Sequence, residues 1–235
     1  MILNCDIGER GADHAVDREL MSCIGLANLA CGGHAGDRHS VAAFRKLAER
    51  EGVALSAHLS YPDRKNFGRH SMTLSWRDLG DALNAQWALL PDLSAVKFHG
   101  ALYHDSAHRA GLARALSGWL ADRRVRTVIC PADSEMALAA ESNGIRVLAE
   151  AFAERRYRIG EEGALQLAPR SLPEAGITDV AVAELQARDL IRKGVVRCME
   201  GETRTLRADT LCIHSDSPLA LELARSVAAM LEQEG

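Results

Sequence analysis

Residues 93–100 read Leu93-Ser94-Ala95-Val96-Lys97-Phe98-His99-Gly100, an apolar run that ends in ionisable side chains and a glycine. Short runs of this kind recur along the chain, and a helical pattern follows nearly every one of them. Most are apolar on both faces, which is typical of parallel strands buried between layers of helices. The sequence therefore predicts strands at residues 2–5, 26–31, 53–57, 94–98, 126–130, 145–149 and 209–213.

Helix start signals lie between these strands. Ser75 and Asp78 have the capping-box spacing, and Thr178 is the expected N-cap of a later helix that stops at Gly194. Ser217 followed by Pro218 has the form of an N-cap with proline at the first helical position. Further helices are expected at residues 38–51, 106–121 and 134–143.

The order of these elements predicts the fold class. Repeated strand–helix units in 235 residues indicate an α/β fold, a single TIM-like (β/α) barrel closed by seven strands. The alternative is a doubly wound open sheet. No linker pattern divides the chain, so residues 1–235 are expected to form one barrel domain. Residues 59–73 and 152–177 are expected to be loops, and residues 195–208 a β-hairpin.

Composition narrows the class of protein. A net charge of −4 with scattered basic residues offers no electrostatic footprint for nucleic acid. No apolar stretch approaches the ~18 residues of a membrane helix, and no targeting pattern precedes the first apolar run. The six cysteines include no C-x-x-C pair and most lie in strand-like runs, so we expect a reduced, cytoplasmic protein. Whether the chain forms a homo-oligomer is left open.

Ionisable side chains collect at the carboxyl ends of the predicted strands. In a parallel barrel these ends open on one face, where the active sites of such barrels are built. We therefore expect one bowl lined by the side chains that follow the first four strands and the last one. These are Asp6, Glu9, His34, His58, Lys97, His99, His214 and Asp216.

Two of these residues are difficult to explain by an ordinary structural role. Asp6 directly follows a strand core, where an unpaired carboxylate would be unfavourable. Lys97 lies inside an apolar run, where lysine rarely occurs without a partner. Asp37, by contrast, is interpreted first as the N-cap of the helix at residues 38–51, and Glu150 is consistent with a surface position.

Several longer motifs are spread over almost the whole chain. They are Asn4–Glu9, Ala27–Asp37, Ser56–His58, Tyr61–Asp63, Phe67–Arg69, Lys97–Tyr103, Pro169–Ser171, Ala208–Thr210 and Cys212–Pro218. These motifs resemble the LamB/YcsF family, whose members are known as the A component of 5-oxoprolinase. They occur in the family's order, and motifs this long are far more specific than a single short signature.

The resemblance implies a barrel of the glycoside hydrolase/deacetylase type. It also implies a hydrolase acting on a cyclic amide C–N bond, which uses ATP to open 5-oxo-L-proline (pyroglutamate) to L-glutamate. Two partner subunits, B and C, belong to this scheme, and phosphorylation of the lactam is assigned to them. The sequence has no G-x-x-x-x-G-K-[ST] phosphate loop, which agrees with that division.

The resemblance and the chemistry of lactam opening together suggest roles. Lys97 and Arg170 are expected to stabilise an anion, since arginine suits a carboxylate or phosphate fork. Asp6 is the expected general base for water, and His99 or His214 the acid for the leaving nitrogen. The residues expected to bind substrate are Glu9, His34, His58, Arg170 and Asp216.

The chain departs from the family pattern beside the presumed site. Gly33 stands where the family usually has Phe, and Leu59-Ser60 stand where it usually has Pro-Gly. These differences lie beside the presumed site and leave the barrel prediction untouched. They leave open which lactam this particular member uses.

Two other functions stay open. Asp6, His34, His58 and His214 would also suit a metal-dependent amidase or deacetylase acting on a cyclic amide or a sugar. Their spacings are long and include no H-x-x-x-H pair, so the presence and identity of a divalent metal are undecided from the sequence. The third hypothesis is a non-catalytic subunit that binds the ligand and passes it to its partners.

Overall fold

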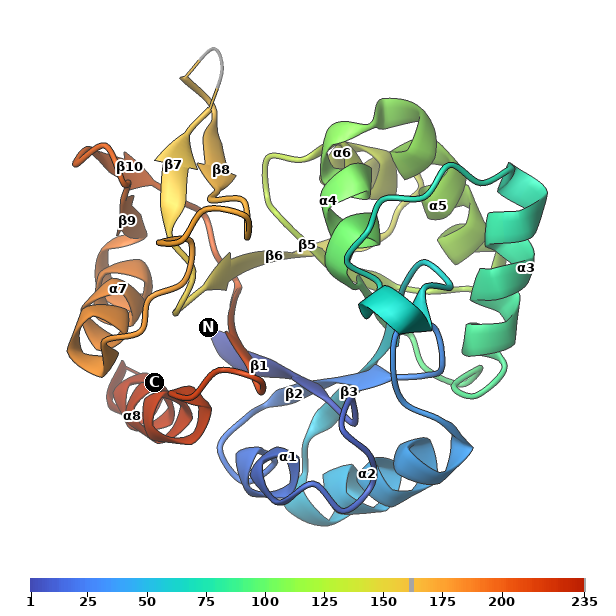
Figure 1. The fold of residues 1–235 in the computed structure, drawn as a ribbon, viewed down its shortest axis with the longest axis horizontal. Coiled ribbons are helices and arrows are strands. Elements are labelled where there is room, and N and C mark those ends of the chain that lie inside the picture. Colours follow the sequence, from blue (N-terminus) through green and yellow to red (C-terminus); the bar gives the residue numbers. More distant parts are fainter. Residues whose placement is uncertain (161–162, 235) are drawn as a thin grey trace.

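The computed structural model describes residues 1–160 and 163–234. Within these residues seven parallel strands close into a barrel: β1 (Ile2–Ile7), β2 (Leu26–Ala30), β3 (Ala54–Leu59), β4 (Ala95–Phe98), β5 (Thr127–Cys130), β6 (Arg146–Phe152) and β11 (Thr210–His214). Their spatial order is β1-β11-β6-β5-β4-β3-β2 (Figure 1). The expected seven-stranded α/β barrel is confirmed. The open sheet is wrong, because each of the seven strands pairs with two neighbours and none of them forms an edge.

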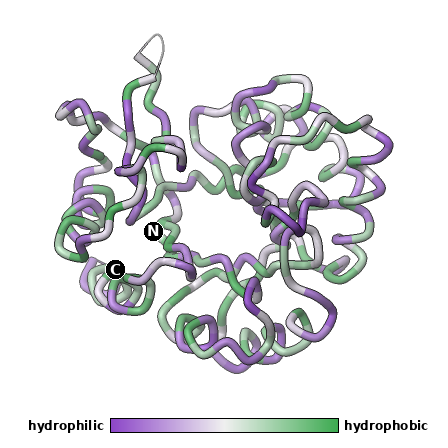
Figure 2. Tube along the Cα trace, viewed as in Figure 1, coloured by the Kyte–Doolittle hydropathy of each residue, from purple (hydrophilic) through white to green (hydrophobic). Residues whose placement is uncertain are grey.

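Helices surround the barrel and cover its outer face (Figure 1). Among the described residues they are α1 (Ala15–Leu20), α2 (Arg38–Glu51), α3 (Trp76–Trp87), α4 (Gly100–His108), α5 (Ala110–Asp122), α6 (Glu135–Ser142), α7 (Val180–Lys193) and α8 (Ala220–Glu234), with a 3-10 turn, η1 (Arg64–Asn66). Hydrophobic and hydrophilic residues alternate along the helices in Figure 2, so each can turn an apolar side to the strands. No helix in this part of the chain is long and apolar enough to cross a membrane.

The strands separate apolar from polar side chains by their alternation. In β1, Leu3, Cys5 and Ile7 belong to the apolar core between strands and helices. Asn4 and Asp6 point to the other face, where Asn4 accepts a hydrogen bond from Asn28 on the neighbouring strand β2 and Asp6 accepts one from Lys97 across the barrel. The interior of the barrel is therefore partly polar, and the main apolar core surrounds it.

A second, smaller apolar cluster consists of Leu26, Ile129 and Leu148. These residues come from β2, β5 and β6, and β2 is adjacent to neither of the other two strands. Because they touch although their strands are not neighbours, they meet inside the barrel. Apolar and polar side chains therefore share the interior.

Two antiparallel hairpins interrupt the alternation of barrel strands and helices along the chain. β9 (Val195–Arg197) pairs with β10 (Thr203–Thr205), which confirms the hairpin expected at residues 195–208. β7 (Tyr157–Ile159) pairs with β8 (Leu165–Leu167), and this hairpin projects from the rim in Figure 1. The loop predicted for residues 152–177 is therefore wrong in part. Strands of three residues carry too short a pattern to be recognised from the sequence.

Three helix boundaries differ from the prediction. The helix expected at residues 106–121 is two helices, α4 and α5, separated at Arg109, whose backbone is extended. α7 has its N-cap one residue later than expected, at Asp179, because that carboxylate accepts hydrogen bonds from two amides of the first turn. α8 begins at Ala220, beyond Pro218, because tight turns occupy the residues between β11 and the helix.

The start of α2 shows how a side chain fixes an element boundary. Asp37 Oδ1 accepts hydrogen bonds from the amides of His39 and Ser40, and the Asp37 amide donates to Ser40 Oγ. The helix ends at Gly52, whose backbone is left-handed with φ 69°. Asp37 is thus the capping residue that the sequence indicated.

Removing this cap should lower stability and leave the fold intact. We expect Asp37→Ala to lower the free energy of unfolding by about 1 kcal/mol, because two amides of the first turn lose their acceptor. Asp37→Asn, which keeps an acceptor oxygen, is the matched control. Chemical denaturation measures both variants. Equal losses in the two, or no loss in Asp37→Ala, would contradict the capping role.

Candidate functional site

Lys97 lies in the polar part of the barrel interior. Only 3% of its side chain is exposed, and its Nζ lies 3.0 Å from Asp6 Oδ1 and 2.8 Å from Glu150 Oε1. The Cys212 sulfur is 3.2 Å away. From its position on β4, Lys97 therefore joins β1, β6 and β11 across the barrel.

Lys97 and its neighbouring carboxylates stabilise one another's ionised forms. Burial alone would lower the pKa of Lys97, but the carboxylates of Asp6 and Glu150 outweigh it and hold that pKa well above its usual range. Burial alone would raise the pKa of Asp6, but His58 and Lys97 hold it well below its usual range. Asp6 and Lys97 are therefore both ionised, in a place where an unpaired charge would be unfavourable.

Amide and hydroxyl side chains extend this group toward β2 and β3. The Asn28 amide donates to Asn4 Oδ1 (2.7 Å) and to Asp6 Oδ1 (2.8 Å), and Ser56 Oγ donates to Asn28 Oδ1 (2.6 Å). Asn4 Nδ2 in turn donates to Thr210 Oγ1 (2.8 Å). Asn4 and Asn28 were not predicted as site residues. Their signal was a polar side chain inside an otherwise apolar strand run.

Three histidines and a glutamate form a second cluster beside Asp6, here called the histidine cluster. His58 Nε2 lies 3.0 Å from His99 Nδ1, and His34 Nε2 lies 2.9 Å from Glu9 Oε1. The rings of His34 and His99 stack in parallel with centroids 3.6 Å apart. Burial lowers the pKa values of His34 and His99 well below their usual range. Burial, with Asp6 nearby, raises the pKa of Glu9 to about 7.

His214, at the end of β11, is oriented by Glu154. Its Nδ1 pairs with Glu154 Oε1, and the same oxygen accepts a hydrogen bond from the His214 amide at 2.9 Å. The imidazole ring stacks on Phe152 with centroids 5.4 Å apart. A ring nitrogen of His214 and a carboxylate oxygen of Asp6 lie within 4.8 Å of each other, which is close enough for one bridging water.

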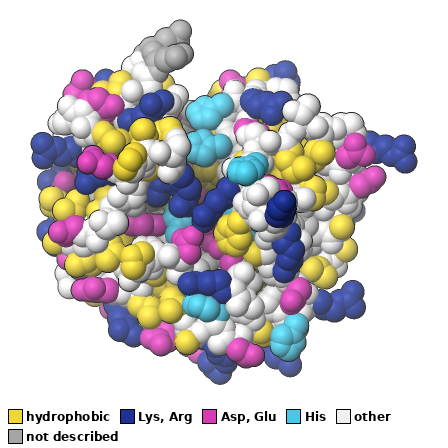
Figure 3. All heavy atoms as spheres, in the orientation of Figure 1, with side chains coloured by type: hydrophobic (Ala, Val, Ile, Leu, Met, Phe, Trp, Pro, Cys, Tyr) yellow, Lys and Arg dark blue, Asp and Glu magenta, His cyan; other side chains and the backbone are white. Residues whose placement is uncertain are grey.

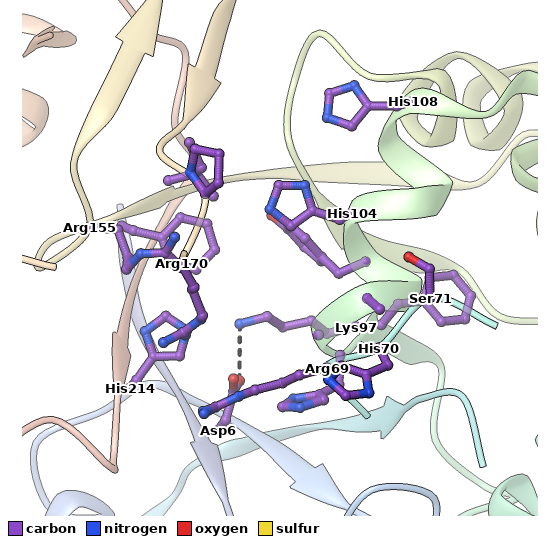
Figure 4. Close-up of a pocket in the computed structure, with 18 of the residues that line it drawn as sticks. Asp6, Arg69, His70, Ser71, Lys97, His104, His108, Arg155, Arg170 and His214 are labelled. Carbon is purple, nitrogen blue, oxygen red and sulfur yellow. Dashed lines mark hydrogen bonds and ion pairs between the residues drawn. The ribbon is translucent and has the colours of Figure 1, made fainter. Parts of the chain in front are cut away.

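These side chains meet at a cavity of about 710 Å³ at the carboxyl ends of the strands. The structure brings six of the predicted residues together in its lining: Asp6, His58, Lys97, His99, Arg170 and His214. Figure 4 shows Lys97 and Asp6 facing each other beside His214. In Figure 3, lysine, arginine and histidine side chains gather around the hollow near the centre of this face.

Arginine side chains line another part of the cavity. Arg170, which the resemblance singled out, and Arg155, which was not predicted, lie close together near His214 in Figure 4. Arg69 joins them from the loop after β3 and pairs with Asp216 at 2.8 Å. The cavity therefore combines an ionised carboxylate with several guanidinium groups.

Arg155 is a buried cation without an acidic partner among the described residues. It is 6% exposed, and its hydrogen bonds go to the carbonyl oxygens of Ala168 (2.6 Å) and Ala175 (3.4 Å). Burial, with Arg170 nearby, lowers the pKa of Arg155 to about 10. A guanidinium in this environment would be stabilised by an anionic ligand in the cavity. A single arginine in a predicted loop gave no signal in the sequence.

Three predicted substrate-binding residues lie outside the cavity lining. Glu9 and His34 belong to the histidine cluster, where they contact each other. Asp216 is partly exposed and is held by Arg69. Of the residues predicted to bind substrate, His58 and Arg170 do line the cavity.

The loop after β3 closes over the histidine cluster through Gly68. Its backbone is left-handed with φ 63°, and a Cβ atom there would lie 2.9 Å from His34 Cβ and 3.2 Å from His99 Cδ2. The Gly68 carbonyl accepts a hydrogen bond from the Ala101 amide (2.9 Å) in the first turn of α4. Glycine is required because the loop backbone packs directly on the imidazole rings.

The departures from the family pattern near β2 and β3 form one packing arrangement. A Cβ atom on Gly33 would lie 2.3 Å from Gln86 Oε1 and from Ser60 Oγ. The Gln86 amide accepts from the Ser60 amide and donates to the Ser60 carbonyl, both at 2.9 Å. Gln86 thus occupies the space that a side chain at Gly33 would need. None of these three residues lines the cavity.

The predicted metal set is divided between two clusters. Among the described residues, donor atoms within 4.8 Å of one another belong to Glu9, His34, His58 and His99, and separately to Asp6, Cys212 and His214. The division follows from strand order, since β11 and β2 lie on opposite sides of β1. Imidazole and carboxylate donors of the first cluster suit a divalent ion such as Zn²⁺.

A parallel barrel with ionised side chains in a cavity at the carboxyl ends of its strands belongs to the α/β-barrel class in which such cavities are active sites. More particularly, the chain belongs to the LamB/YcsF family, whose sequence model matches residues 1–235.

Relatives and a solved structure agree with that assignment. The chain is 40% identical to the 5-oxoprolinase A subunit of Bordetella pertussis over 248 residues, which cover 99% of this chain and 95% of the relative. It is 39% identical to the 5-oxoprolinase A subunit of Thermus thermophilus, with 99% and 96% covered. The crystal structure of a lactam utilization protein from Thermus thermophilus matches with a TM-score of 0.86 at 36% identity, covering 100% of this chain and 97% of that one.

Lys97 should be important for stability as well as for the site. We expect Lys97→Met to lower the free energy of unfolding by about 3–5 kcal/mol, since it leaves the buried carboxylates of Asp6 and Glu150 unpaired. Lys193→Met, which removes an exposed lysine that pairs with Asp189, is the matched control, with an expected loss below about 1 kcal/mol. Urea denaturation compares the two variants. A Lys97→Met variant as stable as the control would contradict the ion-pair argument.

Proposed function

We propose that this chain is the A subunit of an ATP-dependent 5-oxoprolinase, which opens 5-oxo-L-proline to L-glutamate together with partner subunits B and C. The names of its relatives, which are 5-oxoprolinase A subunits and a lactam utilization protein, point to a lactam as the substrate. One observation carries the proposal: a cavity that combines Arg155, which has no acidic partner among the described residues, with the ionised pair Asp6 and Lys97.

The substrate has two features that suit this cavity. 5-Oxoproline carries one carboxylate and one planar amide on a five-membered ring. Arg155 and Arg170 suit the carboxylate, since guanidinium groups pair with carboxylates in a fork. Asp6 and His214 suit the amide, where a water molecule has to be activated and the nitrogen protonated.

Of the two histidines predicted as the acid, His214 is better suited than His99. Both ring nitrogens of His99 are engaged, one with the Phe67 carbonyl (3.0 Å) and one with His58 (3.0 Å). His214 lines the cavity and is oriented by Glu154, the arrangement by which a carboxylate holds a catalytic imidazole. We therefore assign proton delivery to the lactam nitrogen to His214.

Asp6 is assigned to the attacking water, and Lys97 to positioning Asp6. Lys97 and Asn28 hold Asp6 Oδ1, and Asp6 Oδ2 lies 3.3 Å from His58 Nε2. Lys97 already pairs with two carboxylates, so it is not free to bind a further anion. We therefore assign the anion contact that was expected of Lys97 to Arg155, which lines the cavity with Arg170. The charge of Lys97 keeps the Asp6 carboxylate ionised and fixed.

Opening a lactam also needs an activated carbonyl. Transfer of a phosphoryl group from ATP to the amide oxygen releases ADP and makes the carbon electrophilic. Water then adds to that carbon, and the C–N bond breaks as the nitrogen takes a proton, which leaves a γ-glutamyl phosphate. A second water hydrolyses this acyl phosphate to glutamate and inorganic phosphate. We assign the phosphoryl transfer to the partner subunits and the hydrolytic ring opening to this chain. The arginines at the cavity suit a phosphate as well as a carboxylate.

A coupled assay for glutamate tests the proposal. With ATP and the partner subunits, the chain should release glutamate from 5-oxoproline, and Asp6→Asn or His214→Gln should lower kcat by about 10²–10⁴-fold. Unaltered turnover in an Asp6→Asn complex would instead indicate a subunit that only binds ligand. Glutamate release by the isolated chain without ATP would support the second candidate, a metal-dependent amidase, for which Asp6, Cys212 and His214 bring three donor atoms together at the cavity.

The role of Arg155 can be isolated with a substrate analogue. We expect Arg155→Gln to weaken binding of 5-oxoproline by about 10- to 100-fold, because it removes one charge-assisted contact to the carboxylate. Inhibition by 2-pyrrolidinone, the same ring without the carboxylate, should be unchanged. Arg197→Gln, at an exposed position on β9 outside the cavity lining, is the control. Equal weakening of both ligands by Arg155→Gln would refute the carboxylate contact.

A further inference from the structure

The histidine cluster brings four donor atoms to one point. Glu9, His34, His58 and His99 stand at or after the ends of β1, β2, β3 and β4, which are consecutive in the barrel. At most 8% of any of these side chains is exposed. Four strand ends thus direct nitrogen and oxygen donors into one small buried space.

Backbone carbonyls determine which nitrogen of two of the rings carries a proton. A carbonyl oxygen only accepts hydrogen bonds, so His58 Nδ1 donates to the Lys97 carbonyl (3.2 Å) and His99 Nε2 donates to the Phe67 carbonyl (3.0 Å). In neutral rings the remaining nitrogens, His58 Nε2 and His99 Nδ1, are then bare. They lie 3.0 Å apart, and two lone pairs at that distance repel unless a cation interacts with both.

The other two donors surround the same space. Glu9 Oε1 lies 2.9 Å from His34 Nε2, 3.4 Å from His99 Nδ1 and 3.9 Å from His58 Nε2. A tetrahedral zinc ion with bonds of about 2.0–2.1 Å requires its ligand atoms to be about 3.3 Å apart. With the 3.0 Å between His58 Nε2 and His99 Nδ1, the observed separations run from 2.9 to 3.9 Å and lie on both sides of that value. Small shifts of these side chains would bring the donors to tetrahedral spacing.

We propose that Glu9, His34, His58 and His99 bind one divalent transition-metal ion of the zinc class. Three imidazoles and a carboxylate are ligands that suit such an ion. The carbonyl contacts of His58 and His99 match the outer hydrogen bonds that metal-bound imidazoles usually make. Because four protein donors fill a tetrahedral sphere, the ion holds four strand ends together. Its positive charge also lies close to the Asp6 carboxylate, whose Oδ2 is 3.3 Å from His58 Nε2.

The competing explanation is a proton in place of the ion. One additional proton on His58 or His99 would also relieve the repulsion between the two facing nitrogens. It would leave Glu9 and His34 as a simple hydrogen-bonded pair at 2.9 Å. The two explanations differ in metal content and in what a chelator does, so they can be separated without any activity assay.

Metal analysis of the untagged full chain makes that separation. Protein produced in zinc-supplemented medium should contain about one zinc per chain by mass spectrometry. After chelation and addition of Co²⁺, it should show the intense visible absorption of tetrahedral cobalt. Adding excess zinc to the chelated protein should raise Tm by at least about 5 °C.

Ligand variants and matched controls identify the donors. His34→Gln and Glu9→Gln should lose most of the bound zinc and the cobalt absorption, with circular dichroism to confirm that each is folded. His39→Gln, at an exposed histidine on α2, should keep about one ion, because the four donors remain. Arg155→Gln should keep it as well. Since that variant impairs the proposed substrate contact, its zinc content separates failure of the metal site from failure of the lactam proposal.

Two outcomes would overturn the metal proposal. One is wild-type protein without stoichiometric transition metal, without cobalt absorption and with the same Tm in zinc and in chelator. The other is zinc retained in full by folded His34→Gln and Glu9→Gln, because the ion would then be held elsewhere. If neither ligand variant folds, the cobalt spectrum and the Tm of the wild-type chain decide.

Discussion

The barrel is organised around one ammonium group buried among carboxylates. Lys97 lies within 3.0 Å of Asp6 and 2.8 Å of Glu150, so a single side chain on β4 links β1 and β6 through the interior. A buried ion pair of this kind adds little net stability by itself, but loss of one partner leaves an uncompensated charge. The ion pair instead fixes the positions of the charges before a ligand binds, as preorganised electrostatic stabilisation requires.

The two parts of the cavity are built differently. Asp6, Lys97 and His58 stand on barrel strands, whose ladders and interior hydrogen bonds hold them in place. Arg155 and Arg170 stand on the segments that flank the hairpin of β7 and β8, outside the barrel strands. Rigid strands thus carry the groups to which we assign proton transfer, and loops carry the groups to which we assign anion binding, a division common in barrel enzymes.

Local patterns in the sequence predicted much of this, and long-range pairing accounts for what they missed. Lys97 and Asp6 were identifiable because a charge in an apolar run requires a partner. Asn4 and Asn28 carried a weaker signal, because an uncharged amide in an apolar run is less unfavourable than a charge, and their partners lie on neighbouring strands that are distant in sequence. Which histidines contact one another could likewise not be predicted from the sequence. Strand order puts His214 with Asp6, and it separates His214 from the other predicted ligands.

The most direct test of the ion-pair organisation is a thermodynamic cycle on its three members. The free energy of unfolding would be measured for Lys97→Met alone and for Lys97→Met combined with Asp6→Asn and Glu150→Gln. We expect the triple variant to be more stable than the single one, because neutral side chains replace the carboxylates that had lost their partner. A triple variant that is less stable than Lys97→Met alone would show that the ammonium group does not hold this site together.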